Sequence, residues 1–139
     1  MIQFFFQKPV TSLKQRTKLK RFLAGIFKKE KHELESLTYI FCSDEELLKI
    51  NRDFLQHDYY TDIITFNLAV PGNPIAGEIY ISIDRVKDNA AKENTTLKEE
   101  LHRVIFHGAL HLCGYKDKTK RDILAMRAAE DRFLSAYFK

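Results

Sequence analysis

Apolar and polar positions follow one another along the chain in patterns that predict strands and helices. Residues 2–6, 37–42 and 62–70 are short apolar runs rich in aromatic and β-branched side chains, as in buried strands. Residues 77–83 alternate isoleucine with polar residues, which predicts a strand with one polar face. Residues 13–31 repeat apolar side chains at helical spacing. We therefore expect four strands, with a helix between the first two.

Capping signals predict the remaining helices. Ser43 and Thr96 are each followed three residues later by a glutamate, the spacing of a capping box. Gly114 is a plausible stop for the helix that Thr96 opens, Thr119 opens a last helix, and residues 84–94 form a short one. The apolar side chains expected to face inward on these helices include Leu47, Leu48, Phe54, Leu101, Val104, Ile105, Ile123, Met126 and Phe133.

Length and composition fit one α+β domain over residues 1–139, with a roughly four-stranded mixed sheet packed against about five helices. The chain has 139 residues, of which 45% are hydrophobic and 30% charged. No apolar run reaches the roughly 18 residues of a membrane span, and the apolar start lacks the basic region of a signal peptide. Cys42 and Cys113 lie in apolar segments, so we expect no disulfide framework and a cytoplasmic location.

Positive charge is concentrated at the beginning of the chain. Residues 1–35 hold nine Lys/Arg against three Asp/Glu, while the net charge of the whole chain is only +4. Lys14, Lys18, Arg21 and Lys28 recur at helical spacing, opposite the apolar stripe. This basic face is either a phosphate-binding stripe for RNA or an ordinary solvated surface.

The segment 107–117, His-Gly-Ala-Leu-His-Leu-Cys-Gly-Tyr-Lys-Asp, contains a candidate metal site at the end of a central helix. His107 and His111 are four residues apart, so their rings lie about 40° apart around the helix and one turn along it. Two imidazoles in this relation can share one metal ion. Gly114 lets the chain fold back, and Asp117 can then supply a third ligand. Three protein ligands leave a position for water, whose pKa a zinc ion would lower towards ~7.

Other interpretations of the same residues have to be weighed. Two histidines at this spacing also occur on solvent-facing helix surfaces, or as one core and one exposed histidine. A zinc peptidase is disfavoured, because Gly108 stands where such enzymes carry a glutamate base. Cys113 is expected in the core, and His102 on a polar, solvated helix face. The metal hypothesis therefore depends on Gly114 and Asp117 in addition to the pair.

Residues 107–115 resemble the signature of the YbeY family of ribosomal-RNA-maturation endoribonucleases, His-Gly-x-Leu-His-Leu-x-Gly-Tyr-Asp-His. Residues 61–66, Thr-Asp-Ile-Ile-Thr-Phe, resemble its Pro-Thr-Asp-Val-Leu-Ser-Phe segment. Residues 77–82, Gly-Glu-Ile-Tyr-Ile-Ser, resemble its Gly-Asp-Ile-x-Ile-Ser strand. Single residues at matching family positions are Asn51, Asp58, Met126 and Glu130. The matches follow one another in family order.

The resemblance implies an α+β fold, a metal ion, usually zinc, held at three histidine positions, and hydrolysis of single-stranded RNA. It also implies maturation of the 16S ribosomal RNA 3′ end and quality control of late ribosomes, with the small ribosomal subunit as partner. On this chain the three ligand positions are His107, His111 and Asp117. The resemblance assigns neither a general base nor an oligomeric state to this chain.

Two positions depart from the family pattern. Asp117 stands in place of the third histidine, and a carboxylate there shifts the expected preference from Zn²⁺ towards Mn²⁺ or Mg²⁺. Leu55 stands where the family has an arginine that is thought to assist the chemistry or hold phosphate. Candidates for a replacement cation are Lys116, Arg52 and Arg103.

Four polar residues near the motifs have a structural and a functional interpretation. Thr61 and Asp62 either cap a turn or support a metal ligand. Ser82 either caps the next helix or contacts substrate. His57 is expected as a loop residue rather than a ligand.

The leading prediction is a metal-dependent endoribonuclease that acts on single-stranded RNA in ribosome maturation, with no membrane partner. In this prediction a metal-bound water attacks the phosphodiester. The alternative from another class is a ribosome-binding assembly factor whose metal is structural or vestigial, which the absent arginine favours. A third interpretation is a metal-dependent hydrolase of peptides or small phosphodiesters. Exchange of the ion would change RNA cleavage in the first case and only thermal stability in the second.

Overall fold

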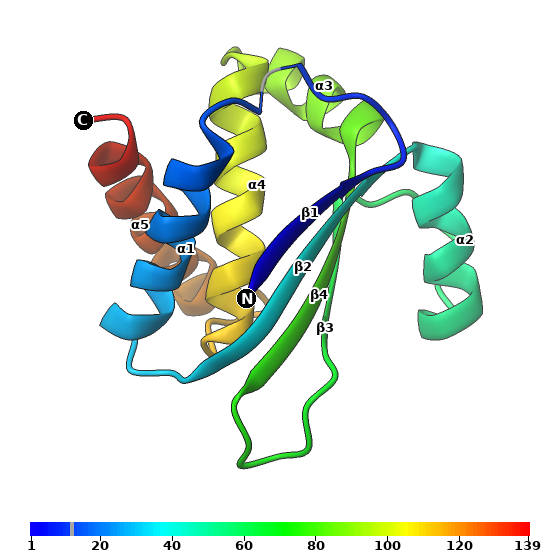
Figure 1. The fold of residues 1–139 in the computed structure, drawn as a ribbon. Helices are drawn as coiled ribbons and strands as arrows, with labels where there is room; N and C mark the ends of the chain where they lie inside the picture. Colours follow the sequence, from blue (N-terminus) through cyan, green and yellow to red (C-terminus); the bar gives the residue numbers. More distant parts are fainter. Residues whose placement is uncertain (12) are drawn as a thin grey trace.

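The computed structural model describes residues 1–11 and 13–139, and in these residues the chain has an α+β fold with an open four-stranded mixed sheet (Figure 1). Pairs β1–β2 and β2–β4 are parallel, whereas β3 is antiparallel to β4. Across the sheet the order is β1 (Ile2–Phe6), β2 (Leu34–Cys42), β4 (Ile75–Ser82) and β3 (Ile63–Asn67). Strand β3 is therefore an edge strand, and several of its residues line the pocket described below.

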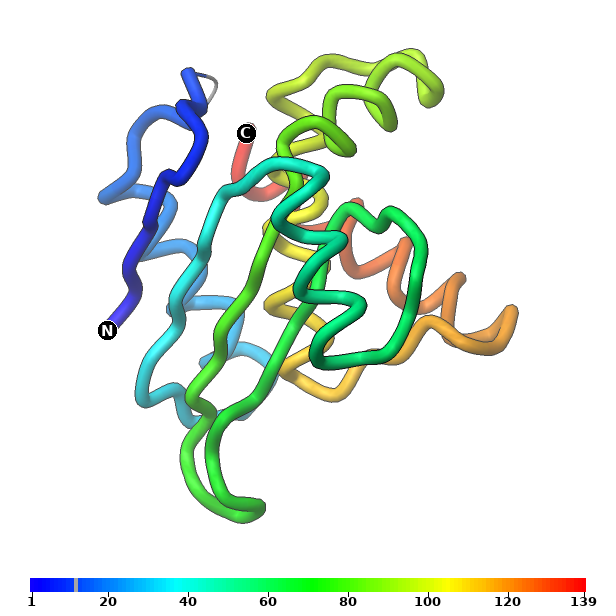
Figure 2. The backbone as a smooth tube through the Cα atoms, turned by 90° about the vertical axis from the view of Figure 1, so that its right-hand side faces the viewer, coloured from blue at the N-terminus to red at the C-terminus, as the bar shows by residue number. Residues whose placement is uncertain are grey.

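Helices cover both faces of the sheet unequally. In the described part of the chain they are α1 (Arg16–Lys29), α2 (Asp44–Leu55), α3 (Ile83–Lys92), α4 (Leu97–Leu112) and α5 (Lys120–Tyr137). Helices α1, α4 and α5 lie on one side of the sheet and α2 on the other (Figure 1). The view turned by 90° shows α2 in front of the strands (Figure 2). Helix α4 is central, since it contacts α1, α3, α5, β3 and β4. None of the helices described is long and apolar enough to cross a membrane.

The predicted elements are confirmed, with shifts of a few residues at their ends. Ser43, Thr96 and Thr119 each cap a helix by accepting a hydrogen bond from the backbone N–H three residues on. The reciprocal capping box occurs at Thr119 with Asp122. Boxes were expected at the N-termini of α2 and α4, but there the glutamate does not accept from the cap backbone. The Glu46 carboxylate accepts from the Ser43 hydroxyl at 3.4 Å, and the Glu99 carboxylate accepts from the Thr95 hydroxyl.

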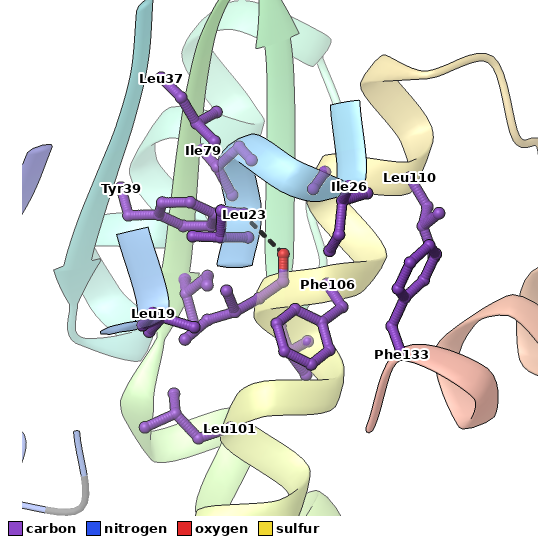
Figure 3. Close-up of a cluster of buried hydrophobic side chains, with 14 of the residues drawn as sticks. Leu19, Leu23, Ile26, Leu37, Tyr39, Ile79, Leu101, Phe106, Leu110 and Phe133 are labelled. Carbon is purple, nitrogen blue, oxygen red and sulfur yellow. Dashed lines mark hydrogen bonds between the residues drawn. The ribbon is translucent and has the colours of Figure 1, made fainter. Parts of the chain in front are cut away.

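The main core lies between the sheet and helices α1, α4 and α5 (Figure 3). On β2, Leu37, Tyr39 and Phe41 face it, because alternate side chains of a strand share a face. The buried Tyr39 hydroxyl donates to the Ile105 carbonyl of α4 at 2.7 Å, which ties the central helix to the sheet (Figure 3). A smaller cluster under α2 contains Cys42, Leu47 and Ile64.

Three helical side chains lie opposite to the sequence expectation. Phe54 and Ile123 were expected in the core and are 71% and 51% exposed. The patch under α2 is small, so the last turn of α2 leaves Phe54 in water. His102 was expected to be solvated but is 1% exposed, because its ring stacks on Tyr137 of α5. Its Nδ1–H donates to the Lys98 carbonyl at 2.7 Å, which satisfies the buried ring.

Candidate metal centre

Close packing of α4 on the sheet positions the histidine pair. A Cβ added at Gly108 would lie 2.9 Å from the Cδ1 atoms of both Ile63 and Ile79. With any larger residue at that position, Ile63 and Ile79 would have to shift, so glycine allows the helix to pack this closely on β3 and β4. Gly114 has φ +101°, the left-handed conformation that glycine adopts readily, and it follows the end of α4 as predicted. The reversal brings the next segment back along the helix.

That reversal brings Asp117 to the two histidines. One ligand atom from each of His107, His111 and Asp117 lies within 4.8 Å of the others. Asp117 Oδ2 is 3.2 Å from His111 Nε2 and 3.7 Å from His107 Nε2. The two imidazole rings are 4.6 Å apart between centroids. The residues expected to share an ion are thus together, in a geometry that could hold one.

The other nitrogen of each ring already has a partner. His107 Nδ1 is 2.6 Å from the Glu130 carboxylate, and His111 Nδ1 is 2.9 Å from the Tyr115 carbonyl. An ionised carboxylate and a carbonyl can only accept, so both Nδ1 atoms carry the hydrogen. Each Nε2 is then the nitrogen that faces Asp117, and in the neutral ring it is free to bind an ion shared with that carboxylate. Metal-binding histidines are usually oriented by such a hydrogen bond at the second nitrogen, so this donor set fits a divalent ion.

Glu130 connects the site to a chain of charged groups on α5. It is 4% exposed, and its second oxygen accepts from Arg103 at 2.9 Å. Arg103 also donates to Asp131 at 2.7 Å. The sequence placed Glu130 on the last helix but did not connect it with His107. The two residues are 23 positions apart and meet only because α5 packs against α4.

The electrostatics of the site favour positive charge. Burial lowers the pKa of His107, but the hydrogen bond to Glu130 and the charges of Glu130, Asp62 and Asp117 outweigh it, so the pKa is raised. Burial raises the pKa of the Asp62 carboxyl, and nearby His107 offsets part of that rise. Burial likewise raises the pKa of Glu100 in the same pocket. Several carboxyl groups thus face a site where a divalent cation would stabilise their charged forms.

The three candidate ligands His107, His111 and Asp117, which we call the metal group, line a cavity of about 780 Å³. Its walls come from α2 and the segment that follows it, from β3, from α4 and from residues 123–130 of α5. Leu55 lies in the wall at the position where the family arginine was expected. The metal group is therefore accessible to a ligand much larger than water.

Two of the three replacement cations expected from the sequence, Arg52 and Arg103, have other partners, and the third, Lys116, is exposed and does not line the pocket. Arg52 forms an ion pair with Asp58 on the surface. Arg103 lies in the pocket wall, but its guanidinium is held by two carboxylates. Arg127 of α5 also lines the pocket, with a half-exposed side chain 3.9 Å from Glu130. Sequence reasoning missed Arg127, since nothing in its local pattern distinguishes it from other exposed helical arginines.

The remaining residues singled out in the sequence divide into two groups: some cap a helix or lie in the core, and others line the pocket. Ser82 accepts from the Arg85 backbone N–H and caps α3. Cys113 is buried, as expected. Asp62 lines the pocket and accepts from Asn89 at 3.1 Å. Thr61 lies beside it in the pocket wall.

Comparison with known proteins adds independent information. The family described as Endoribonuclease YbeY matches residues 4–138. A protein of Cytophaga hutchinsonii with that name is 56% identical over 133 residues, which is 95% of this chain and 93% of that protein. One of Flavobacterium johnsoniae is 50% identical over 114 residues, covering 82% and 81%. The solution structure of a Thermotoga maritima protein matches with a TM-score of 0.70 and 30% identity over 99% of this chain and 89% of that one.

Proposed function

The chain belongs to the YbeY family of endoribonucleases, and on that premise we propose that it cleaves single-stranded RNA in a metal-dependent reaction. The family makes it a hydrolytic endoribonuclease. The observation that carries metal dependence is the meeting of two imidazoles and one carboxylate, with ligand atoms within 4.8 Å of one another, in the lining of an open pocket. We assign residues 1–139 to a single metallohydrolase domain.

His107, His111 and Asp117 are the proposed ligands of one divalent ion per chain. Zn²⁺ suits two imidazoles and a carboxylate, and the carboxylate also admits Mn²⁺ or Mg²⁺. When bound, such an ion supplies Lewis-acid activation of water and offsets charge on phosphoryl oxygens. Glu130 fixes the orientation of the His107 ring, and the Tyr115 carbonyl fixes that of His111.

The proposed cellular role follows the family resemblance. We place the activity in maturation of the 16S ribosomal RNA 3′ end and in quality control of late ribosomes, with the small ribosomal subunit as partner. The two cysteines are buried and unpaired, which suits a reducing cytoplasm.

Elemental analysis of wild type beside Asp117→Ala tests the metal assignment. With no metal added during purification, we expect about one ion per wild-type chain and a large loss in the variant. Asp53→Ala, which removes an exposed aspartate of α2, is the control and should retain the ion. An unchanged metal content in Asp117→Ala would remove that residue from the ligand set. Single-stranded RNA should be cleaved by the metal-loaded wild type and not after chelation.

A second candidate function is a ribosome assembly factor with a structural ion. The observation that favours it is Leu55, an apolar residue in the pocket wall at the position of the family arginine. In that case exchange of the ion would alter the thermal stability and leave RNA uncut.

A further inference from the structure

Aromatic rings line the pocket wall that continues from α2. His57 and Tyr59 both lie in that wall, and their rings stack with centroids 5.1 Å apart and planes 19° apart. The Tyr59 hydroxyl is 2.9 Å from His57 Nδ1, so the two rings form one unit. Tyr59 is 56% exposed. An aromatic pair with this much surface in water, beside a reaction site, offers a face to a flat partner.

This aromatic pair is held in place by a buried amide. Asn51 of α2 is 1% exposed, and its side-chain Nδ2 donates to the Tyr59 carbonyl at 2.9 Å. The backbone carbonyl of Asn51 in turn accepts a hydrogen bond from the His57 backbone N–H at 3.0 Å. The loop is thus fixed to the end of α2 at both of its aromatic residues. A pre-arranged surface loses little conformational entropy when a ligand binds.

A cation lines the same pocket from α5. Arg127 is half exposed and borders the cavity, while the metal group lies between α4 and the following turn. A guanidinium in the wall of this pocket can donate hydrogen bonds to a phosphate oxygen of a strand that passes the metal group. The pocket therefore combines a flat apolar surface, a phosphate-sized charge and candidate metal ligands.

We propose that the His57–Tyr59 pair is a base-stacking platform for single-stranded RNA and that Arg127 holds a neighbouring phosphate of the same strand. This inference rests on the proposed function, because it names how that site takes its substrate. Stacking requires a base whose face is free, and in a duplex both faces are covered by neighbouring pairs. The platform thus gives the pocket its selection for unpaired strands.

Binding of short strands separates the two contacts. The probes are a fluorescein-labelled deoxythymidine octanucleotide and a matched strand with abasic sites, titrated into metal-loaded protein, with strand integrity checked afterwards. For Tyr59→Ala we expect at least about fivefold weaker binding of the thymidine strand, the usual effect of one lost stacking contact. Binding of the abasic strand should not change. Arg127→Gln should weaken the binding of both strands and reduce the slope of log affinity against log salt concentration by about one ion.

Two further variants act as controls. Tyr59→Phe keeps the ring face and should bind the thymidine strand almost as wild type does. Tyr60→Ala removes the adjacent tyrosine, which is also exposed but lies against the Arg85 guanidinium, 5.3 Å from its ring, and should bind normally. Tyrosine fluorescence gives a second readout, since the chain has no tryptophan. The thymidine strand should quench part of this emission in wild type and less in Tyr59→Ala.

The outcomes distinguish this inference from the proposed function. If Tyr59→Ala weakens the binding of both probe strands equally, or of neither, the proposed platform is wrong, even if the wild type cleaves RNA. If Tyr59→Ala weakens binding of the thymidine strand alone, but the wild type cleaves RNA with none of the ions tried, the platform stands and the nuclease proposal fails. With active protein, we expect Tyr59→Ala to raise KM for single-stranded RNA and to leave kcat nearly unchanged.

Discussion

Individual side chains at the metal centre act through their second hydrogen bonds. Glu130 holds the His107 ring through Nδ1, and Arg103 in turn provides a hydrogen bond and a positive charge for this buried carboxylate. The three groups therefore stabilise one another, and the orientation of His107 as a proposed ligand depends on Glu130, which is not itself in the proposed ligand set.

Glu130→Gln should weaken metal binding about 10- to 100-fold, because the amide is a poorer partner for the His107 ring than the carboxylate. Competition with a chelating dye measures the affinity. Asp131→Asn is the matched control: it removes the charge of the other partner of Arg103, leaves the Glu130 contact intact, and should bind metal as wild type does. Equal affinity in Glu130→Gln would show that the orienting bond contributes nothing.

Helix α4 is the element on which fold and site meet. One face packs on the sheet through Gly108, another carries the candidate ligands His107 and His111, and a third holds His102 against α5. Changes in its packing should therefore affect both stability and the pocket.

Gly108→Ala should destabilise the fold by about 1–3 kcal/mol, because the new methyl overlaps Ile63 and Ile79 in a closely packed core. Urea unfolding measures the loss, and metal affinity should fall with it as α4 moves. Gly25→Ala in α1 meets no atom within 4 Å and should instead stabilise by up to about 1 kcal/mol. Destabilisation by both substitutions to the same extent would contradict the packing argument.

His102 should make stability depend on pH. Burial lowers its pKa below the usual value near 6.5, so the unfolded chain binds the proton more tightly. The stability that the buried neutral His102 ring contributes is complete above the usual pKa near 6.5. It is lost as the pH falls below that value, because the unfolded chain is then protonated first. The destabilisation caused by His102→Gln should thus be largest at pH 8 and shrink towards pH 5 in urea titrations.

Phe106→Leu provides the comparison for that series. It removes packing from a neighbour of the His102 ring and no titrating group. Its cost should stay constant over the same pH range. A pH-independent cost for His102→Gln as well would mean that the buried ring does not titrate as described.

At the scale of the whole molecule, charged contacts join segments that are distant in sequence. Asp44 at the start of α2 accepts from Ser82 at 2.7 Å and from Arg85 of α3 at 2.7 Å. Asp84 accepts from the Asp44 backbone N–H and pairs with Lys8, which follows β1. This network fastens both helices to the end of the sheet where β2 and β4 finish.

Asp44→Asn should cost about 1.5–3 kcal/mol at pH 7, the range for hydrogen bonds to a charged group. The Arg85 hydrogen bond holds the pKa of Asp44 below its usual 3.8, so this stabilisation is present above that value and disappears as the pH falls through the folded-state pKa. Urea unfolding between pH 7 and pH 3 measures it. Asp58→Asn, in an exposed pair, should change stability by less than about 1 kcal/mol.

The sequence alone determined the elements and the ligand set to be tested. Periodicity, caps and Gly114 are local properties, so four strands, five helices and the approach of Asp117 to the histidine pair could be predicted from nearby residues. Only the tertiary structure decided which long-range neighbours complete the site. Glu130 reaches His107 because α5 packs on α4, Arg127 enters the pocket from the same helix, and Phe54 stays in water because the patch under α2 is small. These contacts depend on how elements pack, which local spacing does not encode.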